Sequence, residues 1–305
     1  MGDPNDTIYP EIVRWIKPKV KRSERRLPSD GELLTEEDAQ KLMEAAEHPR
    51  NKAFVATLWE SGARVGEIGS LKVKNVTFDK HGTVITVMGK TGSRKIRLVL
   101  STPYLSTWLN NHALTTEPDA PLWTNLGPIR KHKAMSYSNI RKILQTVAKK
   151  AGLKKRCNPH LFRHSRATML ANHLTEFQMN QYFGWIQGSD MPSTYVHMSG
   201  READKAILAM NGIETQEAKQ QTTLQPIICP RCETINTPDA KHCNKCAGIV
   251  NLKHALDIEV EEMKQKTVRK EADDMMDLLM RDKEVQALLS EKISQLGGIK
   301  NRHTE

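Results

Sequence analysis

The sequence predicts a mainly α-helical fold with a small antiparallel β-sheet (α+β), followed by a short metal-binding module and further helices. Three observations lead to this fold class. Helical patterns account for most of residues 33–213. Two β-branched segments flank a glycine-containing turn within that range. Four of the five cysteines lie close together, between residues 229 and 246.

Helix signals begin where a polar, basic N-terminal arm, residues 1–32, ends. Thr35, with Asp38 three residues later, has the spacing of a capping box and predicts a helix N-terminus. A second helix is expected to end at Gly62, because glycine readily adopts the left-handed conformation that stops a helix. The stretch "RVGEIGSLKVKNVTF" then predicts another short helix that runs into a strand.

A hairpin signal lies in the middle of this domain. The segments Thr83–Met88 and Arg94–Leu100 are separated by "GKTGS". They predict two antiparallel strands, with Gly89 and Gly92 supplying the turn. From about 101 to 210 the pattern is mostly helical again, interrupted by "PDAPLWTNLGP".

These signals divide the chain into five parts. They are a basic arm at 1–32, the main domain at 33–213, a linker at 214–227, a cysteine module at 228–248 and a helical region at 252–297. In the last part an apolar stripe includes Met275, Leu278 and Leu289. Two interpretations of this stripe are equally compatible with the sequence: it packs on the protein's own core, or it forms a short coiled coil or binds a partner helix.

Composition narrows the classes of partner. The chain has 305 residues, with 46 Lys+Arg against 36 Asp+Glu, which gives a net charge of +10. This excess favours a polyanionic partner such as nucleic acid. No stretch of about 18 apolar residues occurs, so no membrane span is expected. The N-terminus has no basic region followed by an apolar one, so we expect a cytoplasmic protein.

The cysteines form two C-x-x-C pairs separated by ten residues: Cys229, Cys232, Cys243 and Cys246. Two such pairs complete a tetrahedral four-thiolate site, which predicts a structural Zn²⁺ because no position remains for water. A disulfide pair is the weaker alternative in a chain without an export signal. The segment resembles zinc ribbons, which usually carry glycine after each pair, whereas Glu233 and Ala247 stand here. An altered turn is therefore expected. The sequence is compatible with contacts of this module to DNA and with contacts to protein.

One predicted helix carries an unusual pair of side chains. His160 and Arg163 lie three residues apart in "PHLFRHSRAT", so they share a helix face. Two such groups repel each other unless an anion lies between them. Further candidates occur in other segments: Arg64 in "GARVGEI", Lys90 in "MGKTGS", Trp185 in "QYFGWIQGSD" and Tyr195 in "PSTYVHMS". Each alone has an ordinary structural explanation, but in this order they closely resemble the tyrosine recombinase (phage integrase) family, and within it the short archaeal Xer-like integrases. The resemblance covers roughly residues 33–212.

The resemblance implies a site-specific DNA recombinase that cleaves and rejoins strands through a 3′-phosphotyrosyl intermediate. Double-stranded DNA and a homo-tetramer on synapsed DNA are the implied partners. Tyr195 is the implied nucleophile, and His160 is expected to take its proton. Arg64 and Arg163 are expected to clamp the scissile phosphate, with His160 as a third contact. Lys90 is the implied general acid for the leaving 5′-oxygen.

The remaining expectations concern supporting residues. Trp185 occupies the position where most members carry a second histidine, and its indole N–H is expected to donate to a phosphate oxygen. Glu67 is expected to orient Arg64, or a neighbouring group, through a salt bridge. No cofactor is expected for catalysis. Ordinary structural roles, on a helix surface or against the backbone, are assigned to His164, Arg166 and His197.

The family normally carries an N-terminal core-binding domain, whereas here only about 32 residues precede the predicted catalytic domain. This suggests a naturally short form or a truncated gene product. Two alternatives to the recombinase hypothesis therefore stay open: a truncated integrase acting as a non-catalytic DNA-binding regulator, and a topoisomerase IB-like nicking–closing enzyme. Covalent trapping on a nicked DNA substrate separates the enzymes from the regulator.

Overall fold

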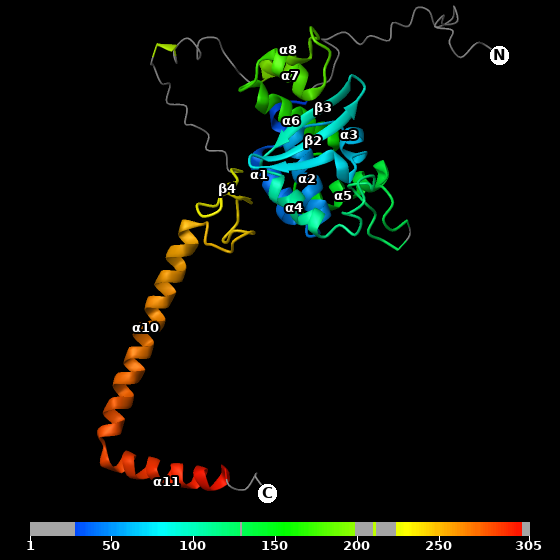
Figure 1. Cartoon of the computed structure of the whole chain (residues 1–305). Helices are drawn as coiled ribbons and strands as arrows, with labels where there is room; N and C mark the ends of the chain where they lie inside the picture. The colour runs from blue at the N-terminus through cyan, green and yellow to red at the C-terminus, as the bar shows by residue number, and fades with distance from the viewer. Residues whose placement is uncertain (1–27, 129, 199–209, 212–223, 301–305) are drawn as a thin grey trace, which may run out of the picture. The chain divides into compact units, whose positions relative to one another are not determined.

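The computed structural model describes residues 28–128, 130–198, 210–211 and 224–300 (Figure 1). The chain divides into two units, Met1–Pro226 and Ile227–Glu305. The predicted fold class is confirmed: helices dominate and the sheet of the first unit is small and antiparallel. The arm at 1–27 and most of the expected linker at 214–227 lie outside the described residues. No helix in the described part of the chain combines the length and apolar content needed to cross a membrane.

The first unit contains short 3-10 turns, one sheet and eight labelled α-helices among its described residues. Its elements are η3 (Asp30–Glu32), α1 (Glu36–Ala45), α2 (Pro49–Ser61), α3 (Val65–Gly69), η4 (Val73–Asn75), β1 (Val76–Asp79), β2 (Gly82–Gly89), β3 (Gly92–Leu98), α4 (Thr102–Asn110), α5 (Tyr137–Lys150), α6 (Pro159–Ala171), α7 (Glu176–Phe183) and α8 (Met191–Met198).

Two local signals place the first helices as predicted. The Thr35 side chain accepts from the backbone N–H of Asp38, whose side chain accepts in return, so the capping box at α1 is confirmed. Gly62 ends α2 with φ +53°. A Cβ at that position would lie 2.9 Å from the Phe183 ring and 3.0 Å from Cβ of Arg166. Glycine is therefore needed there both for its backbone conformation and for its small size.

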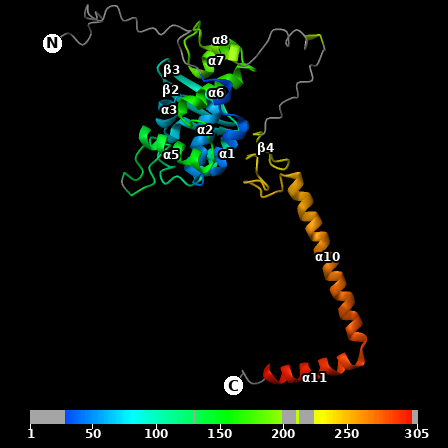
Figure 2. The ribbon, with the colours of Figure 1, turned by 180° about the vertical axis from the view of Figure 1, so that it is seen from behind.

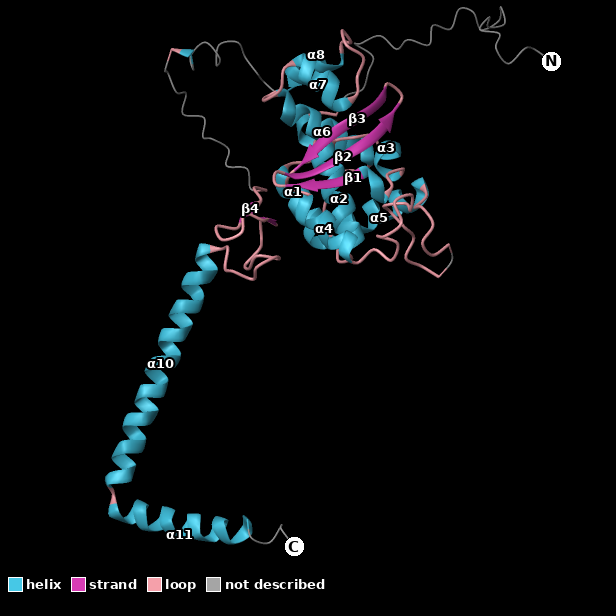
Figure 3. Ribbon diagram, viewed as in Figure 1, coloured by secondary structure: helices cyan, strands magenta, loops and turns pink. Residues whose placement is uncertain are grey.

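The three-stranded sheet has the order β1-β2-β3, with both pairs antiparallel (Figure 3). Its register pairs Ile85 with Ile96 and Gly89 with Gly92, which leaves Lys90 and Thr91 as a two-residue turn. The predicted hairpin is therefore confirmed. Alternate residues of β2 are buried, as expected for a sheet with one face on the core.

Helix α2 is the centre of the core, since it packs against α1, α4, α6 and β3. The main hydrophobic cluster is built around it and includes Phe54, Trp59 and Trp123. A second, smaller cluster joins α6, α7 and α8 and includes Phe183, Trp185 and Tyr195. Both views of the ribbon show these three helices together at one end of the unit (Figures 1 and 2).

The second unit has a two-stranded sheet, β4 (Ile227–Ile228) with β5 (Ile235–Asn236), and two helices, α10 (Leu252–Arg281) and α11 (Lys283–Lys300). The predicted helical region is thus two helices. The Asp282 carboxylate accepts from the N–H of Glu284 and so begins the second one. The residues of the predicted apolar stripe, such as Leu278 and Ile293, are exposed in this unit. The coiled-coil or partner-helix interpretation stays a prediction.

Candidate active site and metal site

A cavity of about 360 Å³ lies where α3, the β2–β3 turn and the start of α6 meet. We call it the basic cavity. Its lining residues are Arg64, Val65, Gly66, Glu67, Met88, Gly89, Lys90, Pro159, His160 and Arg163. The structure therefore brings the four predicted cation-capable side chains, and Glu67, together from three separate segments of the chain.

Local sequence signals explain how the helices present these side chains. Arg64 is the N-cap residue of α3, two residues after the glycine that ends α2. At α6, the Asn158 side chain accepts from the N–H of Leu161, and Pro159 occupies the first turn, where it is tolerated best. The helix consequently starts directly before His160 and presents Arg163 one turn later.

Arg163 is a fixed cation. Its side chain lies inside the protein, and the residue is 8% exposed. One terminal nitrogen donates to the Gly62 carbonyl at 3.1 Å and the other to the Phe183 carbonyl at 2.8 Å. The guanidinium also lies over the rings of Phe183 and Trp185. Burial and the nearby Arg64 lower the pKa of Arg163 to about 10, so it stays protonated at neutral pH.

Arg64 is held differently, through a carboxylate. Its side chain is 39% exposed, and its Nη1 lies 3.1 Å from Oε1 of Glu67, whose side chain is 4% exposed. Glu67 also accepts from the Arg64 backbone N–H at 2.9 Å. The expected salt bridge is therefore present. Burial alone raises the pKa of Glu67, but hydrogen bonds from Arg94 and Arg64 outweigh it and hold that pKa below its ordinary value.

Tyr195 does not line the basic cavity. It lies on α8 and is 1% exposed, with its ring stacked on Trp185 at a centroid distance of 5.4 Å. Trp185 in turn stacks on Phe183. The Tyr195 hydroxyl is hydrogen-bonded to Nδ1 of His164 at 2.8 Å. The described structure thus holds the predicted nucleophile in an aromatic stack, next to the Trp185 ring that Arg163 contacts but outside the lining of the basic cavity.

The contact between Tyr195 and His164 was not predicted from the sequence. The sequence interpretation gave His164 an ordinary role on the helix surface or against the backbone and expected His160 to take the Tyr195 proton, which stays a prediction. Burial, and then the charges of His160 and Arg163, lower the pKa of His164, so its imidazole is neutral at pH 7. Burial raises the pKa of Tyr195, and Arg163 opposes this only in part. Arg166 does contact the backbone as expected, donating to the Glu60 carbonyl.

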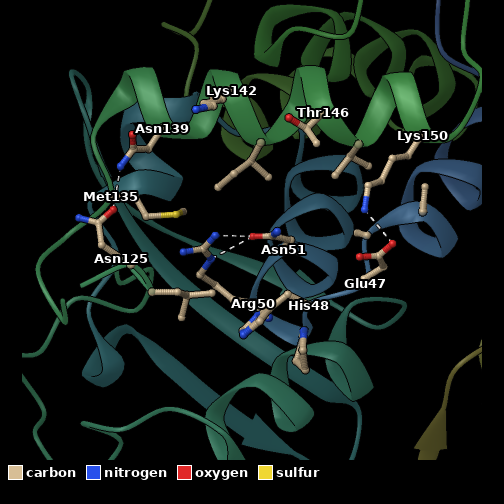
Figure 4. Close-up of a pocket in the computed structure, with 17 residues that line it drawn as sticks. Glu47, His48, Arg50, Asn51, Asn125, Met135, Asn139, Lys142, Thr146 and Lys150 are labelled. Carbon is tan, nitrogen blue, oxygen red and sulfur yellow. Dashed lines mark hydrogen bonds and ion pairs between the residues drawn. The ribbon is translucent and has the colours of Figure 1, made fainter. Parts of the chain in front are cut away.

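A larger cavity, of about 650 Å³, lies between the α1–α2 junction and α5 (Figure 4). Two of its charged side chains already have partners: Arg50 donates to Asn51, and Lys150 lies 2.7 Å from Glu47. None of the predicted site residues lines it. Size alone therefore does not identify the reactive site, and the chemistry points to the smaller, basic cavity.

The four clustered cysteines fit a metal ion. Their Sγ atoms all lie within 4.8 Å of one another. Cys229 Sγ is 3.6 Å from Cys246 Sγ, and the Cys232–Cys243 separation is also 3.6 Å. Four thiolates around one tetrahedral zinc, with Zn–S bonds of about 2.3 Å, require sulfur separations of roughly 3.8 Å. The donor set and spacing therefore suit a tetrahedral metal, and all four cysteines are free of disulfides.

The turns after each cysteine pair keep the left-handed conformation that ribbons usually reserve for glycine. Glu233 has φ +56° and Ala247 has φ +58°. Their N–H groups donate to the carbonyls of Cys229 and Cys243, both at 2.9 Å. The altered turn expected from the sequence stays a prediction. Two residues with side chains occupy a strained region of backbone space.

Replacing Ala247 with glycine is expected to tighten metal binding. The left-handed conformation costs an alanine about 1 kcal/mol relative to glycine. Metal binding to such a module includes the free energy of folding it, so the gain should appear as a roughly two- to fivefold lower metal dissociation constant. Competition with a colorimetric zinc chelator measures it. Ala240→Gly, in the same module and without positive φ, is the control and should not tighten binding. Equal effects of the two substitutions on the metal dissociation constant would contradict the interpretation that the backbone of Ala247 is strained.

Comparison with known proteins gives three findings. The profile of the phage integrase family matches residues 32–202. The chain is 26% identical over 206 residues to the tyrosine recombinase XerA of Pyrococcus furiosus, covering 67% of this chain and 68% of the relative. It is 31% identical over 159 residues to XerC of Lactobacillus delbrueckii subsp. bulgaricus, covering 49% and 51%.

Among solved structures, the post-cleavage complex of the XerH site-specific recombinase bound to palindromic difH substrate aligns with a TM-score of 0.51. The aligned region covers 65% of this chain and 58% of that one, at 21% identity, so this likeness concerns the fold alone. The family match lies within the first unit. The cysteine cluster and the two C-terminal helices lie beyond the matched residues.

Proposed function

The chain belongs to the phage integrase family and is a site-specific tyrosine recombinase, and from this premise we propose that the basic cavity binds the scissile phosphate of double-stranded DNA. One observation carries the proposal: four cation-capable side chains from three segments line the same cavity. Among the described residues that line it, Glu67 is the one carboxylate, and both of its oxygens accept from arginines. The cavity thus presents excess positive charge to a phosphodiester.

The two arginines would stabilise the charge that builds on the phosphate oxygens in the transition state. Arg163 is buried, and carbonyls and aromatic rings hold it in place, so its position costs little reorganisation. Arg64 is more exposed and is held by its ion pair with Glu67. His160, at the exposed start of α6, would add a third contact.

In the cleavage step, the Tyr195 oxygen would form a bond to phosphorus as the bond from phosphorus to the 5′-oxygen breaks. The phenol proton would pass to His160, and Lys90 would protonate the leaving 5′-oxygen. Attack of a 5′-hydroxyl on the 3′-phosphotyrosine reverses the step, so strands can be rejoined or exchanged. Because Tyr195 is hydrogen-bonded to His164 in the structure, that hydrogen bond would have to break before the hydroxyl attacks the phosphate. Trp185, which stacks on Tyr195, would donate its indole N–H to a phosphate oxygen.

The parts of the chain would divide this work. We assign catalysis to residues 33–213 and a structural Zn²⁺ to the ribbon at 228–248, where its four thiolates hold the fold together and take no part in strand cleavage. Strand exchange between two DNA sites would require a homo-tetramer, and the location would be cytoplasmic, with the DNA. The regulator hypothesis is not favoured, because a protein that only binds DNA has no need of Lys90 and Tyr195. A topoisomerase-like activity is likewise not favoured by the recombinase relatives.

A DNA substrate nicked beside the scissile phosphate tests the function and its metal requirement together. We expect a covalent protein–DNA adduct, seen on a denaturing gel, at a near-normal rate in EDTA. The reason is the donor set of the basic cavity, whose single described carboxylate is already engaged by Arg64 and Arg94. The Cys229→Ser, Cys232→Ser double variant should lose its metal and still form the adduct. Loss of cleavage in EDTA with recovery in Mg²⁺ would replace the proposal with a metal-dependent nuclease.

A further inference from the structure

A buried ion pair beside the basic cavity was not foreseen from the sequence. Arg94, on β3, has a side chain that is 9% exposed. Its two terminal nitrogens donate to the two oxygens of Glu67, at 3.0 and 2.7 Å. Its Nε donates to the Tyr182 carbonyl at 2.9 Å. The planar fork is therefore fully oriented by β3, α3 and the end of α7.

The ion pair packs directly under the turn that carries Lys90. Gly89 precedes that lysine, and a Cβ at Gly89 would lie 2.5 Å from Oε1 of Glu67 and 3.1 Å from Nη1 of Arg94. The backbone at the end of β2 thus rests on the Arg94–Glu67 pair, with no room for a side chain between them. The same Glu67 holds Arg64, so one carboxylate connects the phosphate-binding arginine to the base of the turn.

The guanidinium also contacts the segment before Trp185. A Cβ at Gly184 would lie 2.7 Å from Nη1 of Arg94. The turn itself reaches the same point, because the Thr91 hydroxyl donates to the Gly184 carbonyl at 3.3 Å. Arg94 therefore lies at a junction where the turn, α3 and the end of α7 meet.

We propose that Arg94 is a positioning residue that fixes the two-residue turn carrying Lys90 against the phosphate-binding face. This inference rests on the proposed role of Lys90 as general acid. A lysine at position 94 would keep the charge but lose the fork that contacts two Glu67 oxygens and a carbonyl at once. Without Arg94, Glu67 would retain only Arg64 as a charged partner, and the turn would lose the surface on which it rests.

The test compares two nicked substrates. One has the natural 5′-oxygen leaving group, and the other carries a bridging 5′-sulfur. A thiol has a pKa of about 8.5, far below that of an alcohol, so the sulfur substrate needs no general acid. Lys90→Ala is the reference: it should slow cleavage of the oxygen substrate by roughly a hundredfold or more, and the sulfur should restore most of the rate.

Arg94→Gln should slow cleavage of the oxygen substrate at saturating DNA by at least about tenfold and leave DNA affinity unchanged. On the sulfur substrate, the cleavage rate of this variant should return to near that of the unmodified protein. Arg94→Lys should recover only part of the rate on the oxygen substrate. Arg97→Gln is the matched control, since Arg97 lies on the same strand in an exposed pair with Asp79. It should change neither rate. A purely structural role for Arg94 would slow both substrates equally.

Thr91→Val provides a second variant in an exposed turn, should Arg94→Gln fail to fold. It removes only the contact with Gly184 and should give a smaller loss with the same recovery on sulfur. If Lys90→Ala itself does not recover on sulfur, the proposed role of Lys90 fails, whatever Arg94 does. If Lys90→Ala recovers but Arg94→Gln does not, the inference about Arg94 is overturned. If Arg94→Gln is unfolded, Thr91→Val decides the question. The inference about Arg94 is then overturned if Thr91→Val slows cleavage of both substrates equally or slows neither.

Discussion

Replacing Arg163 with alanine is expected to slow strand cleavage by at least about a hundredfold, the scale for losing one preorganised donor to a transition state. The residue is protonated at neutral pH, with a pKa of about 10, and it lines the basic cavity beside Arg64. Its guanidinium is already oriented by the carbonyls of Gly62 and Phe183. Single-turnover cleavage of the nicked substrate at saturating DNA measures the loss.

The stability of this variant has to be measured separately. Truncating Arg163 leaves two carbonyls without their donor, which costs about 1–3 kcal/mol for each that stays buried. Arg163→Lys keeps the charge but cannot reproduce two carbonyl contacts and a phosphate contact with one ammonium, so it should not restore the rate. Arg64→Ala removes a half-exposed side chain with little risk to the fold, and it should slow cleavage to a similar degree.

Arg166 offers the matched control for this prediction. It lies one turn after Arg163 on α6, donates to the carbonyl of Glu60, and does not line the basic cavity. Arg166→Ala should therefore lower stability without slowing cleavage of the folded protein. Near-normal cleavage by both Arg163→Ala and Arg64→Ala would refute the proposal that these two arginines bind the scissile phosphate.

Sequence reasoning succeeded where the signal is local. The capping box at Thr35, the stop at Gly62 and the hairpin around Gly89 and Gly92 each depend on backbone rules that act over a few residues. The cysteine pairs are equally local, and the structure brings all four Sγ atoms together. These positions were predictable because neighbouring residues alone determine the geometry.

Tertiary packing produced what the sequence did not reveal. His164 follows Arg163 directly, but only the packing of α6 against α8 places its imidazole beside Tyr195. Arg94 lies in a basic strand, "SRKIR", where spacing does not distinguish it from the exposed Arg97. The positive φ of Ala247 was missed because alanine seldom adopts it, and the turn is held there by the module around it.

Tyr195→Phe is expected to abolish covalent adducts while DNA affinity is unchanged. Only the hydroxyl is lost, so the ring can keep its stacking on Trp185 and α8 keeps its place in the second cluster. The variant also loses the hydrogen bond to His164, at a cost of about 1 kcal/mol. A denaturing gel for adducts and a binding titration on the same nicked DNA measure the two properties separately.

Tyr182→Phe is the control that makes this result specific. Tyr182 lies on α7, and its hydroxyl donates to the Glu60 carbonyl at 2.9 Å. Burial raises its pKa to about 12. Both variants thus lose one hydroxyl and one hydrogen bond inside the same unit, but only Tyr195 belongs to the helix that would deliver a nucleophile to the basic cavity. Adducts should persist in Tyr182→Phe and vanish in Tyr195→Phe. Adducts in both would mean that another residue attacks the phosphate, because no hydroxyl would remain at position 195 to form the bond.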